Sequence, residues 1–349
     1  MSVETSPIVG VAEIEAARRR GVEFLLRHIA EDGAIAGAGR PRISYYRVPW
    51  ALVVSGETAA AHRTLAWIER TGIGEDGAFH GGVAWDAAAN RAFNTYPETV
   101  LAYGAWLLRR FDVARRVFAF AAQFQDPATG GVWMYRDRTS PSDPQLLFLT
   151  CQFGMSAIIT GQLERAIAVG AWLERLWQAQ PDLPHVLYTV WTQADGLVTR
   201  PPAGEDPRHY VNDAREELQL HYNGGIAAAF LAQLGMATGD SKWLELGRAY
   251  QRFSMESTER QFATKQVCKS AWGAGLLFHA TRDPEYLPWL RKMGAWFVAE
   301  QEADGGWSNT RVLDPDPPLA HRIEITAEFV VHLDTVIGAL AAANGLIVT

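Results

Sequence analysis

The stretch Glu300-Gln-Glu-Ala-Asp-Gly-Gly-Trp307 marks a tight reversal of the chain between two helical segments. Asp accommodates turn geometry, and Gly supplies the positive φ that a sharp reversal needs. Similar turns follow three earlier helical segments, at Asp32-Gly33, Asp76-Gly77, and Asp126 with Gly130-Gly131. The recurrence of this turn indicates a repeated unit made of two helices and a turn.

Two kinds of helical pattern alternate between these turns. The first is amphipathic with one charged face, which is typical of outer helices; it covers residues 11–30, 57–71, 112–125, 163–179, 241–257 and 284–301. The second is apolar nearly all round, which is typical of buried helices; it covers residues 45–55, 96–110, 144–160, 215–238, 264–281 and 322–343. The alternation predicts one all-α domain over residues 1–349, in which six helical hairpins close into an (α/α)6 toroid.

One step of this repeat is longer than the others because it contains an insertion at residues 180–213. Its segments 185–191 and 197–199 are rich in strand-forming residues and flank Gln193-Ala-Asp-Gly196. This pattern predicts a β-hairpin that turns at Asp195-Gly196. We expect the aromatic residues Tyr188, Trp191 and Tyr210 to form a lid over one mouth of the toroid.

Composition limits the classes of partner. The 349-residue chain is 48% hydrophobic and carries a net charge of −7, which fits a folded protein and provides no basic surface for nucleic acid. No stretch reaches about 18 uncharged apolar residues, so we expect no membrane insertion. The N-terminus lacks the order of a signal peptide, and Cys151 and Cys268 are too few for a disulfide scaffold. A cytoplasmic location is therefore expected.

The Gln and Gly-Trp residues of 300–307, echoed from Gln125 to Trp133, resemble the repeats of the terpenoid cyclase and protein prenyltransferase superfamily. That resemblance implies a helical toroid. The chain lacks the Asp-x-Asp-Asp acid, the aspartate-rich magnesium motif and the zinc ligands of those enzymes. Sugar epimerases and polysaccharide lyases have similar turns. Nucleotide-binding glycine motifs are also absent, so we expect an enzyme without metal or cofactor.

The last inner segment carries three titratable residues on one helical stripe. Glu324, Glu328 and His332 recur at i, i+4 and i+8, and a buried charge must be paired or used. We expect all three to face a central cavity, with Glu328 forming an ion pair with Lys269 of the neighbouring hairpin. The structural alternative is that Glu328 and His332 only pair with basic residues of adjacent helices, namely Arg47, Arg322, Lys265 or Lys269.

Further candidates lie on the other inner segments. Glu217 and His221 are one helical turn apart on the fourth inner segment and are candidate acid and base residues. Tyr and Trp at helix starts can line a pocket or stabilise a cation. The expected substrate-binding residues are Tyr45, Tyr46, Trp50, Trp85, Tyr96, Trp133, Trp191, Tyr222, Asn223, Lys265, Lys269, Trp272 and Trp307.

Three functions remain open. The first is a cyclase or isomerase for a hydrophobic terpenoid, polyene or polyketide-like molecule, in which burial raises the pKa of Glu328 or Glu324 and His332 or His221 is the complementary base. The second is a carbohydrate epimerase, lyase or hydrolase, because histidines on the fourth and sixth inner segments resemble those of the acylglucosamine epimerase group. The third is a toroid that binds a ligand without catalysis. The sequence does not indicate an oligomeric state.

Overall fold

The structure is a computed structural model that describes residues 9–38, 42–80, 95–308 and 317–345. Its outer helices are α1 (Val11–Arg27), α3 (Thr58–Thr71), α6 (Phe111–Ala121), α8 (Leu163–Gln178), α10 (Ser241–Met255) and α12 (Leu287–Ala299). Its inner helices are α2 (Val48–Val54), α5 (Tyr96–Leu107), α7 (Leu147–Ile159), α9 (Tyr222–Thr238), α11 (Lys269–Thr281) and α13 (Leu319–Ala343). The predicted (α/α)6 toroid is confirmed.

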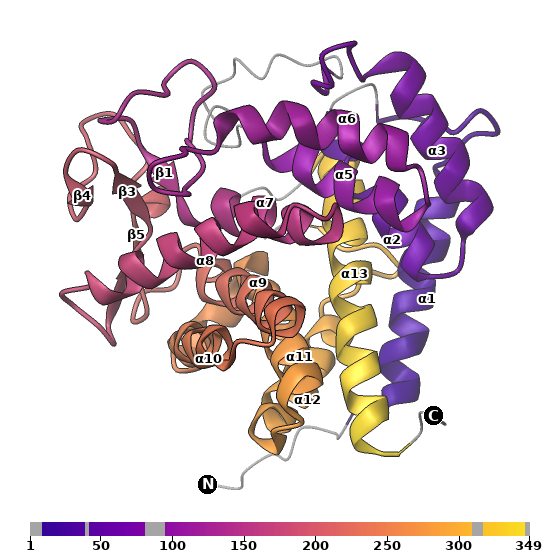
Figure 1. Cartoon of the computed structure of the whole chain (residues 1–349). Helices are drawn as coiled ribbons and strands as arrows, with labels where there is room; N and C mark the ends of the chain where they lie inside the picture. The colour runs from indigo at the N-terminus through magenta and orange to yellow at the C-terminus, as the bar shows by residue number, and fades with distance from the viewer. Residues whose placement is uncertain (1–8, 39–41, 81–94, 309–316, 346–349) are drawn as a thin grey trace, which may run out of the picture.

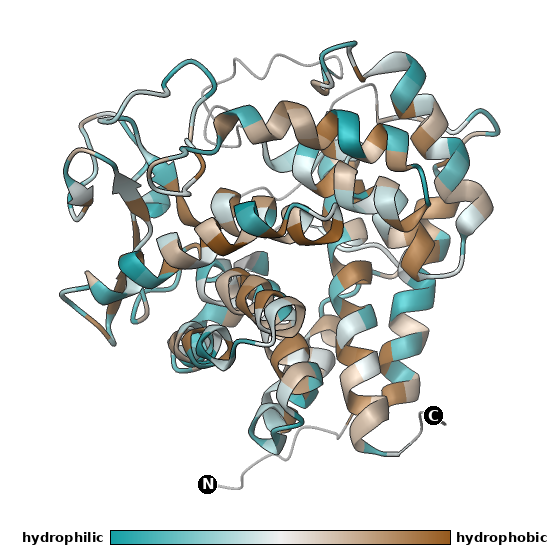
Figure 2. Ribbon diagram, in the orientation of Figure 1, coloured by the Kyte–Doolittle hydropathy of each residue, from teal (hydrophilic) through white to brown (hydrophobic). Residues whose placement is uncertain are grey.

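The inner helices form a closed ring. Each contacts the next in chain order, and α13 contacts both α2 and α1, which joins the last hairpin to the first. Figure 1 shows this closure, with α13 in yellow beside α1 in indigo. Figure 2 shows the apolar character of α7 and α9, whereas the outer helices α3 and α8 carry hydrophilic stripes.

The closing helix α13 is apolar along most of its length. By length and composition it could cross a membrane, but 67% of its most apolar window is buried inside the ring. The core helix of a soluble protein passes the same length and composition test. The absence of membrane insertion stays a prediction.

Four glycine turns hold neighbouring hairpins together. Gly33, Gly77, Gly130 and Gly305 all have φ between +84° and +92°, as the sequence predicts. A Cβ at any of them would lie 2.2–2.7 Å from a backbone carbonyl oxygen of the next outer helix around the ring. The last of these contacts, from Gly305 to Arg20 of α1, closes the outer ring. Only glycine fits this approach.

A second kind of contact involves the residue two positions after each of these glycines. The backbone N–H there donates to a side-chain oxygen within, or just before, the following inner helix. The pairs are Ile35 with Tyr45, Phe79 with Glu98, Val132 with Thr150, and Trp307 with Thr326. Each turn is therefore fixed both to the next outer helix and to its own inner helix.

The insertion forms two small antiparallel sheets. Strand β2 (Val186–Tyr188) pairs with β5 (Val211–Asp213), and β3 (Val190–Thr192) pairs with both β1 (Gln145–Leu146) and β4 (Gly196–Leu197). The predicted hairpin is confirmed as β3 and β4. The segment 185–191, predicted as one strand, is divided between the two sheets.

Two inner helices begin at least five residues later than the sequence predicts, and α2 and α7 begin three residues later. Residues 215–221 precede α9, because the Asp213 carboxylate accepts from the backbone and side chain of Arg215 and forms a local turn. Residues 265–267 form a short 3₁₀ turn before α11. Both segments are polar, and neither continues the apolar pattern of the helix that follows.

Candidate active site

Several inner helices begin at one central region of the toroid. Arg47 is the residue before α2, and Tyr96, Tyr222 and Lys269 are the first residues of α5, α9 and α11. The helix α13 passes them and contributes Glu328 from its middle. Helix starts that meet inside the ring thus bring together polar side chains from distant parts of the sequence.

These helices enclose a cavity of about 10 Å³, which holds about one water molecule. Its lining combines charged, polar and aromatic groups: Arg47, Trp50, Tyr96, Gln152, Trp272, Glu328, Val331 and His332. The expected open apolar pocket is absent from this part of the described structure. Side chains fill most of the centre instead.

Glu328 is the hub of an ion-pair network. The Arg47 Nη1 donates to Glu328 Oε2 at 3.0 Å and to Glu324 Oε1 at 2.9 Å. Lys269 Nζ donates to Glu328 Oε1, so the predicted ion pair is confirmed. Burial opposes ionisation of Glu328, but the charges of Arg47 and Lys269 outweigh it and lower its pKa. The expectation of a raised pKa at Glu328 was wrong, because two cations face it.

His332 lies one helical turn after Glu328 on the same stripe. Its ring stacks on Trp272 with centroids 5.3 Å apart, and its Nε2 lies 3.9 Å from Glu328 Oε1. Burial lowers the pKa of His332 to about 3, against the opposing effect of Glu328. The buried Nδ1 has no hydrogen-bond partner within the described part of the chain. At neutral pH, His332 is therefore an uncharged imidazole with one unused nitrogen.

Aromatic groups surround this network. The Tyr46 hydroxyl donates to Glu324 at 2.5 Å, and Arg47 Nη2 donates to the Tyr96 hydroxyl at 3.1 Å. Lys269 Nζ lies 4.7 Å from the Tyr222 ring centroid. Trp50 meets Trp272 edge to face at 5.7 Å. The geometry therefore groups these predicted residues: Tyr46, Trp50, Tyr96, Tyr222, Lys269, Trp272, Glu324, Glu328 and His332.

Other predicted residues have structural contacts away from the cavity. Tyr45 stacks on Trp67 and holds a turn, as described above. Trp307 is fully buried, and its Nε1 donates to the Phe297 carbonyl oxygen between hairpins. Lys265 pairs with Glu300 at 2.5 Å. These side chains stabilise the ring and do not line the cavity.

The second predicted acid and base pair is not at the cavity. Glu217 forms a solvent-facing pair with Arg260 at 2.7 Å. His221 is buried but bonds the Glu216 carbonyl oxygen at 2.9 Å through Nε2, because α9 begins only after it. His221 therefore does not face His332 across the cavity.

The remaining predicted residues also lie outside the lining. Asn223 is buried in the first turn of α9, whereas Trp133 and Trp191 are half-buried before β1 and in β3. Trp85 lies outside the described residues.

Sequence reasoning missed two polar lining residues, Arg47 and Gln152, and the apolar Val331. Arg47 was considered only as a structural partner, and its position became clear when α13 closed against α2. Gln152 is buried in the apolar helix α7, and its Nε2 has no hydrogen-bond partner among the described atoms. A glutamine inside an otherwise apolar inner helix was the signal available for it.

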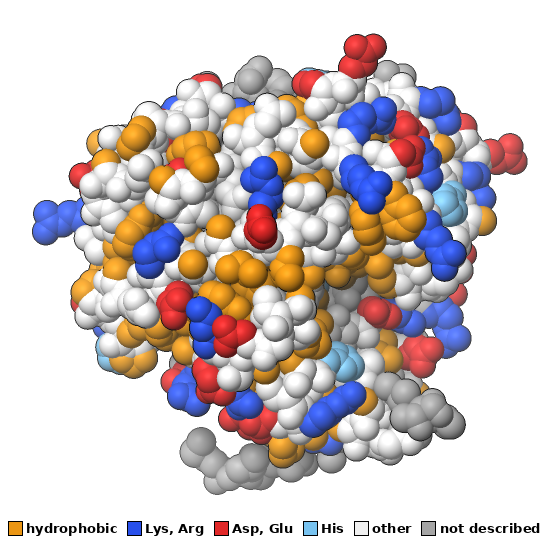
Figure 3. Space-filling model, viewed as in Figure 1, with side chains coloured by type: hydrophobic (Ala, Val, Ile, Leu, Met, Phe, Trp, Pro, Cys, Tyr) orange, Lys and Arg blue, Asp and Glu red, His pale blue; other side chains and the backbone are white. Residues whose placement is uncertain are grey.

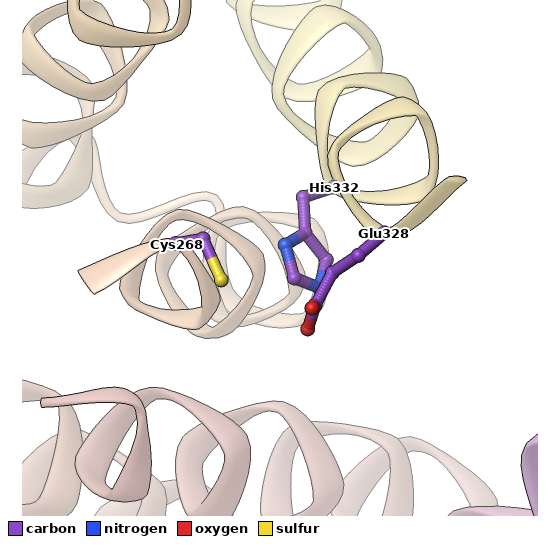
Figure 4. A group of neighbouring side chains, drawn as sticks. All are labelled: Cys268, Glu328 and His332. Carbon is purple, nitrogen blue, oxygen red and sulfur yellow. The ribbon is translucent and has the colours of Figure 1, made fainter. Parts of the chain in front are cut away.

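Figure 4 shows Cys268 at the start of α11 near Glu328 and His332 of α13. One ligand atom from each of these residues lies within 4.8 Å of the others. However, Arg47 and Lys269 already place two positive charges on Glu328, and burial raises the pKa of the Cys268 thiol. A divalent cation would meet like charges and a protonated thiol. These residues do not fit a metal, and the expectation of a metal-free site stays a prediction.

The surface carries charges of both signs. Figure 3 shows Lys and Arg interspersed with Asp and Glu over the visible face, and no area of a single sign stands out on it.

The sequence matches no protein-family model, and no curated protein matches it. Solved structures do match its fold. A family 76 glycoside hydrolase from a bovine Bacteroides thetaiotaomicron strain is 15% identical, with a TM-score of 0.60, over 93% of this chain and 77% of that one.

Two further structures match over nearly their whole length. An unsaturated glucuronyl hydrolase specific for heparin is 12% identical, with a TM-score of 0.63, over 96% of this chain and 99% of that chain. A D-mannose isomerase is 12% identical, with a TM-score of 0.62, over 98% of this chain and 100% of that chain. At these identities the likeness shows the fold alone.

These matches correct the family expected from the sequence. The neighbours are (α/α)6 proteins described as carbohydrate hydrolases or isomerases, so the resemblance to terpenoid cyclases and prenyltransferases was wrong. The Gly-Trp turn that suggested it is a packing device: Trp307 fills the space beside Gly21 of α1. Any toroid of helical hairpins can use such a turn.

Proposed function

We propose that the protein is a carbohydrate-active enzyme that isomerises or epimerises a sugar by proton transfer, with His332 as the general base. The observation that carries this proposal is the uncharged, buried His332 imidazole, whose Nδ1 is unused at a polar cavity. A general base must be deprotonated and within reach of the proton that it removes. The names of the structural neighbours, which include a D-mannose isomerase, support a sugar as substrate.

In the proposed reaction, His332 Nδ1 takes a proton from the carbon next to the carbonyl group of an open-chain sugar. The electron pair of that C–H bond moves into the enediolate, the proton of the adjacent hydroxyl group passes to the former carbonyl oxygen, and the His332 imidazolium returns its proton to the former carbonyl carbon, which gives the isomer. For epimerisation the enediolate turns over, so that His332 returns the proton to the opposite face of the original carbon. The Tyr96 hydroxyl and the Arg47 guanidinium, which also line the cavity, supply donors for the oxygen on which charge develops.

Glycoside hydrolysis fits these residues less well. It requires one protonated carboxyl group as a general acid and a second carboxylate. Glu328 cannot serve as that acid, because Arg47 and Lys269 lower its pKa. A lining that includes Arg47, Tyr96, Gln152, Glu328 and His332 also argues against a hydrophobic terpenoid substrate.

A sugar needs more room than the cavity offers, so the site must open. Glu324 is the most exposed of the four charged residues of the network, with 16% of its side chain accessible to solvent. We propose that the chain acts as one domain and that the 180–213 insertion acts as a lid.

Because Arg47 and Lys269 occupy the Glu328 carboxylate, a second candidate function is a toroid that binds a ligand without catalysis. Conversion of a sugar distinguishes the two functions. Proton NMR of D-mannose, D-glucose and D-fructose incubated with the protein should show interconversion of at least one of them. If all three sugars bind or fail to bind without conversion, the isomerase proposal is rejected.

A further inference from the structure

The charges around the cavity balance one another. Arg47 and Lys269 are the cations of the network, and Glu324 and Glu328 are its carboxylates. The other inner helices, α5, α7 and α9, contribute Tyr96, Gln152 and Tyr222, which are uncharged at neutral pH. Glu98 of α5 pairs instead with Arg136 at 2.6 Å and is directed toward a turn. Within the described part of the chain, the site therefore has no net charge.

Glu328 occupies the position that an external anion would favour. Its two carboxylate oxygens accept separately from Arg47 and Lys269. Lys269 begins α11 and Tyr96 begins α5, and the N-terminal end of a helix also attracts negative charge. The protein's own carboxylate thus fills the anion position, and the charged donors of the site face it.

The polar atoms left unpaired at the cavity are neutral. His332 Nδ1 and Gln152 Nε2 are both buried without a hydrogen-bond partner among the described atoms. An amide N–H and an imidazole nitrogen suit hydroxyl and carbonyl oxygens of an uncharged ligand. A substrate carboxylate would instead approach Glu328 and leave its own charge without a cation.

We infer that the site is specific for an uncharged sugar and that Glu328, assisted by Glu324, excludes sugar acids. This specificity rests on the proposed function, because it concerns the substrate of the same site. Glu328 then has a role beyond folding, because its carboxylate pairs with the two cations that the carboxylate of a uronate would need.

Isothermal titration calorimetry at pH 7 with D-mannose and D-glucuronate tests this inference. The wild-type protein should bind D-mannose at least about tenfold more tightly than D-glucuronate. Glu328→Gln leaves one cation without its carboxylate and should shift this ratio toward D-glucuronate by at least about tenfold. Glu324→Gln lies at the partly exposed side of the network and provides a second variant if the first fails to fold. Glu217→Gln alters a surface ion pair and should keep the wild-type ratio.

Two results overturn the inference and leave the proposed function standing: wild-type protein that binds D-glucuronate as tightly as D-mannose, or folded carboxylate variants that keep the wild-type ratio. Wild-type protein that binds neither sugar also overturns the inference, and the proposed function fails with it if the protein converts none of D-mannose, D-glucose and D-fructose.

Discussion

Arg47 Nη1 lies 3.0 Å from Glu328 Oε2, although the two residues are 281 positions apart in the sequence. The contact joins the start of α2 to the middle of α13, where the last hairpin of the ring meets the first. The same ion pair therefore closes the inner ring and sets the charge of the candidate site.

Replacing Arg47 with Leu should reduce the free energy of unfolding by about 3–5 kcal/mol, because two largely buried carboxylates lose a shared partner. Equilibrium unfolding in urea measures this change. Arg260→Leu is the matched control, since 64% of the Arg260 side chain is exposed and its pair with Glu217 should contribute less than about 1 kcal/mol. Equal losses in the two variants would contradict the account.

Stability should depend on pH through His332. Burial lowers its pKa from the ordinary 6.5 to about 3 in the folded protein, so the unfolded chain binds a proton first as pH falls. The free energy of unfolding should therefore decrease between pH 6.5 and pH 3, with up to about 1.4 kcal/mol per pH unit from this residue. His332→Gln should have a shallower decrease in the same titration, and an unchanged slope would argue against a buried neutral imidazole.

Glu328 should also make the free energy of unfolding decrease as pH falls, over a lower pH range than His332. Its folded pKa is lowered, so its contribution to stability is present above the unfolded value of 4.5 and is lost as pH falls toward its folded value. Glu328→Gln should remove this loss, which urea unfolding at pH 5 and pH 3 would reveal. A full wild-type loss in the variant would contradict the pairing with Arg47 and Lys269.

Trp307 should matter for folding more than for binding. It is fully buried between hairpins, so Trp307→Ala should reduce the free energy of unfolding by about 3–5 kcal/mol. Trp191→Ala removes a half-buried side chain of the insertion and should cost less. Thermal unfolding compares the two, and a smaller loss for Trp307 would reject its role as a packing element.

The repeated turn contact can be tested at Thr326. Thr326→Val keeps the shape of the side chain but removes the acceptor for the buried Trp307 N–H, which should cost about 1–3 kcal/mol. Thr160→Val is a suitable comparison, because the buried Thr160 hydroxyl bonds only carbonyl oxygens of the helix that it ends. The two variants should differ in the midpoint of urea unfolding. Indistinguishable midpoints would argue against a stabilising contact between Thr326 and Trp307.

Much of the fold could be predicted from the sequence because the repeat is local. Apolar periodicity identifies each helix, and an Asp-Gly turn specifies each of four reversals without long-range information. The start of α9 was missed because Asp213 bonds Arg215 and forms a turn that resembles a helix cap in sequence.

The candidate site was predictable only in part. Spacing alone places Glu324, Glu328 and His332 on one stripe of α13. The predicted direction of the pKa shift at Glu328 was wrong, because that direction depends on Arg47, which reaches Glu328 only after the ring closes. Tyr45 and Trp307 were assigned to binding because aromatic residues near helix starts look alike in sequence, whether they pack or line a cavity.

Hydrogen exchange at a substrate carbon tests the role of His332 most directly. D-Mannose incubated with the protein in D₂O should incorporate deuterium at C2, which proton NMR detects as loss of the C2 proton signal. His332→Gln, folded by circular dichroism, should abolish that exchange, whereas Glu217→Gln should retain it. Exchange that persists in His332→Gln, or wild-type protein that exchanges none of the sugars named above, would contradict the assignment of His332 as the base.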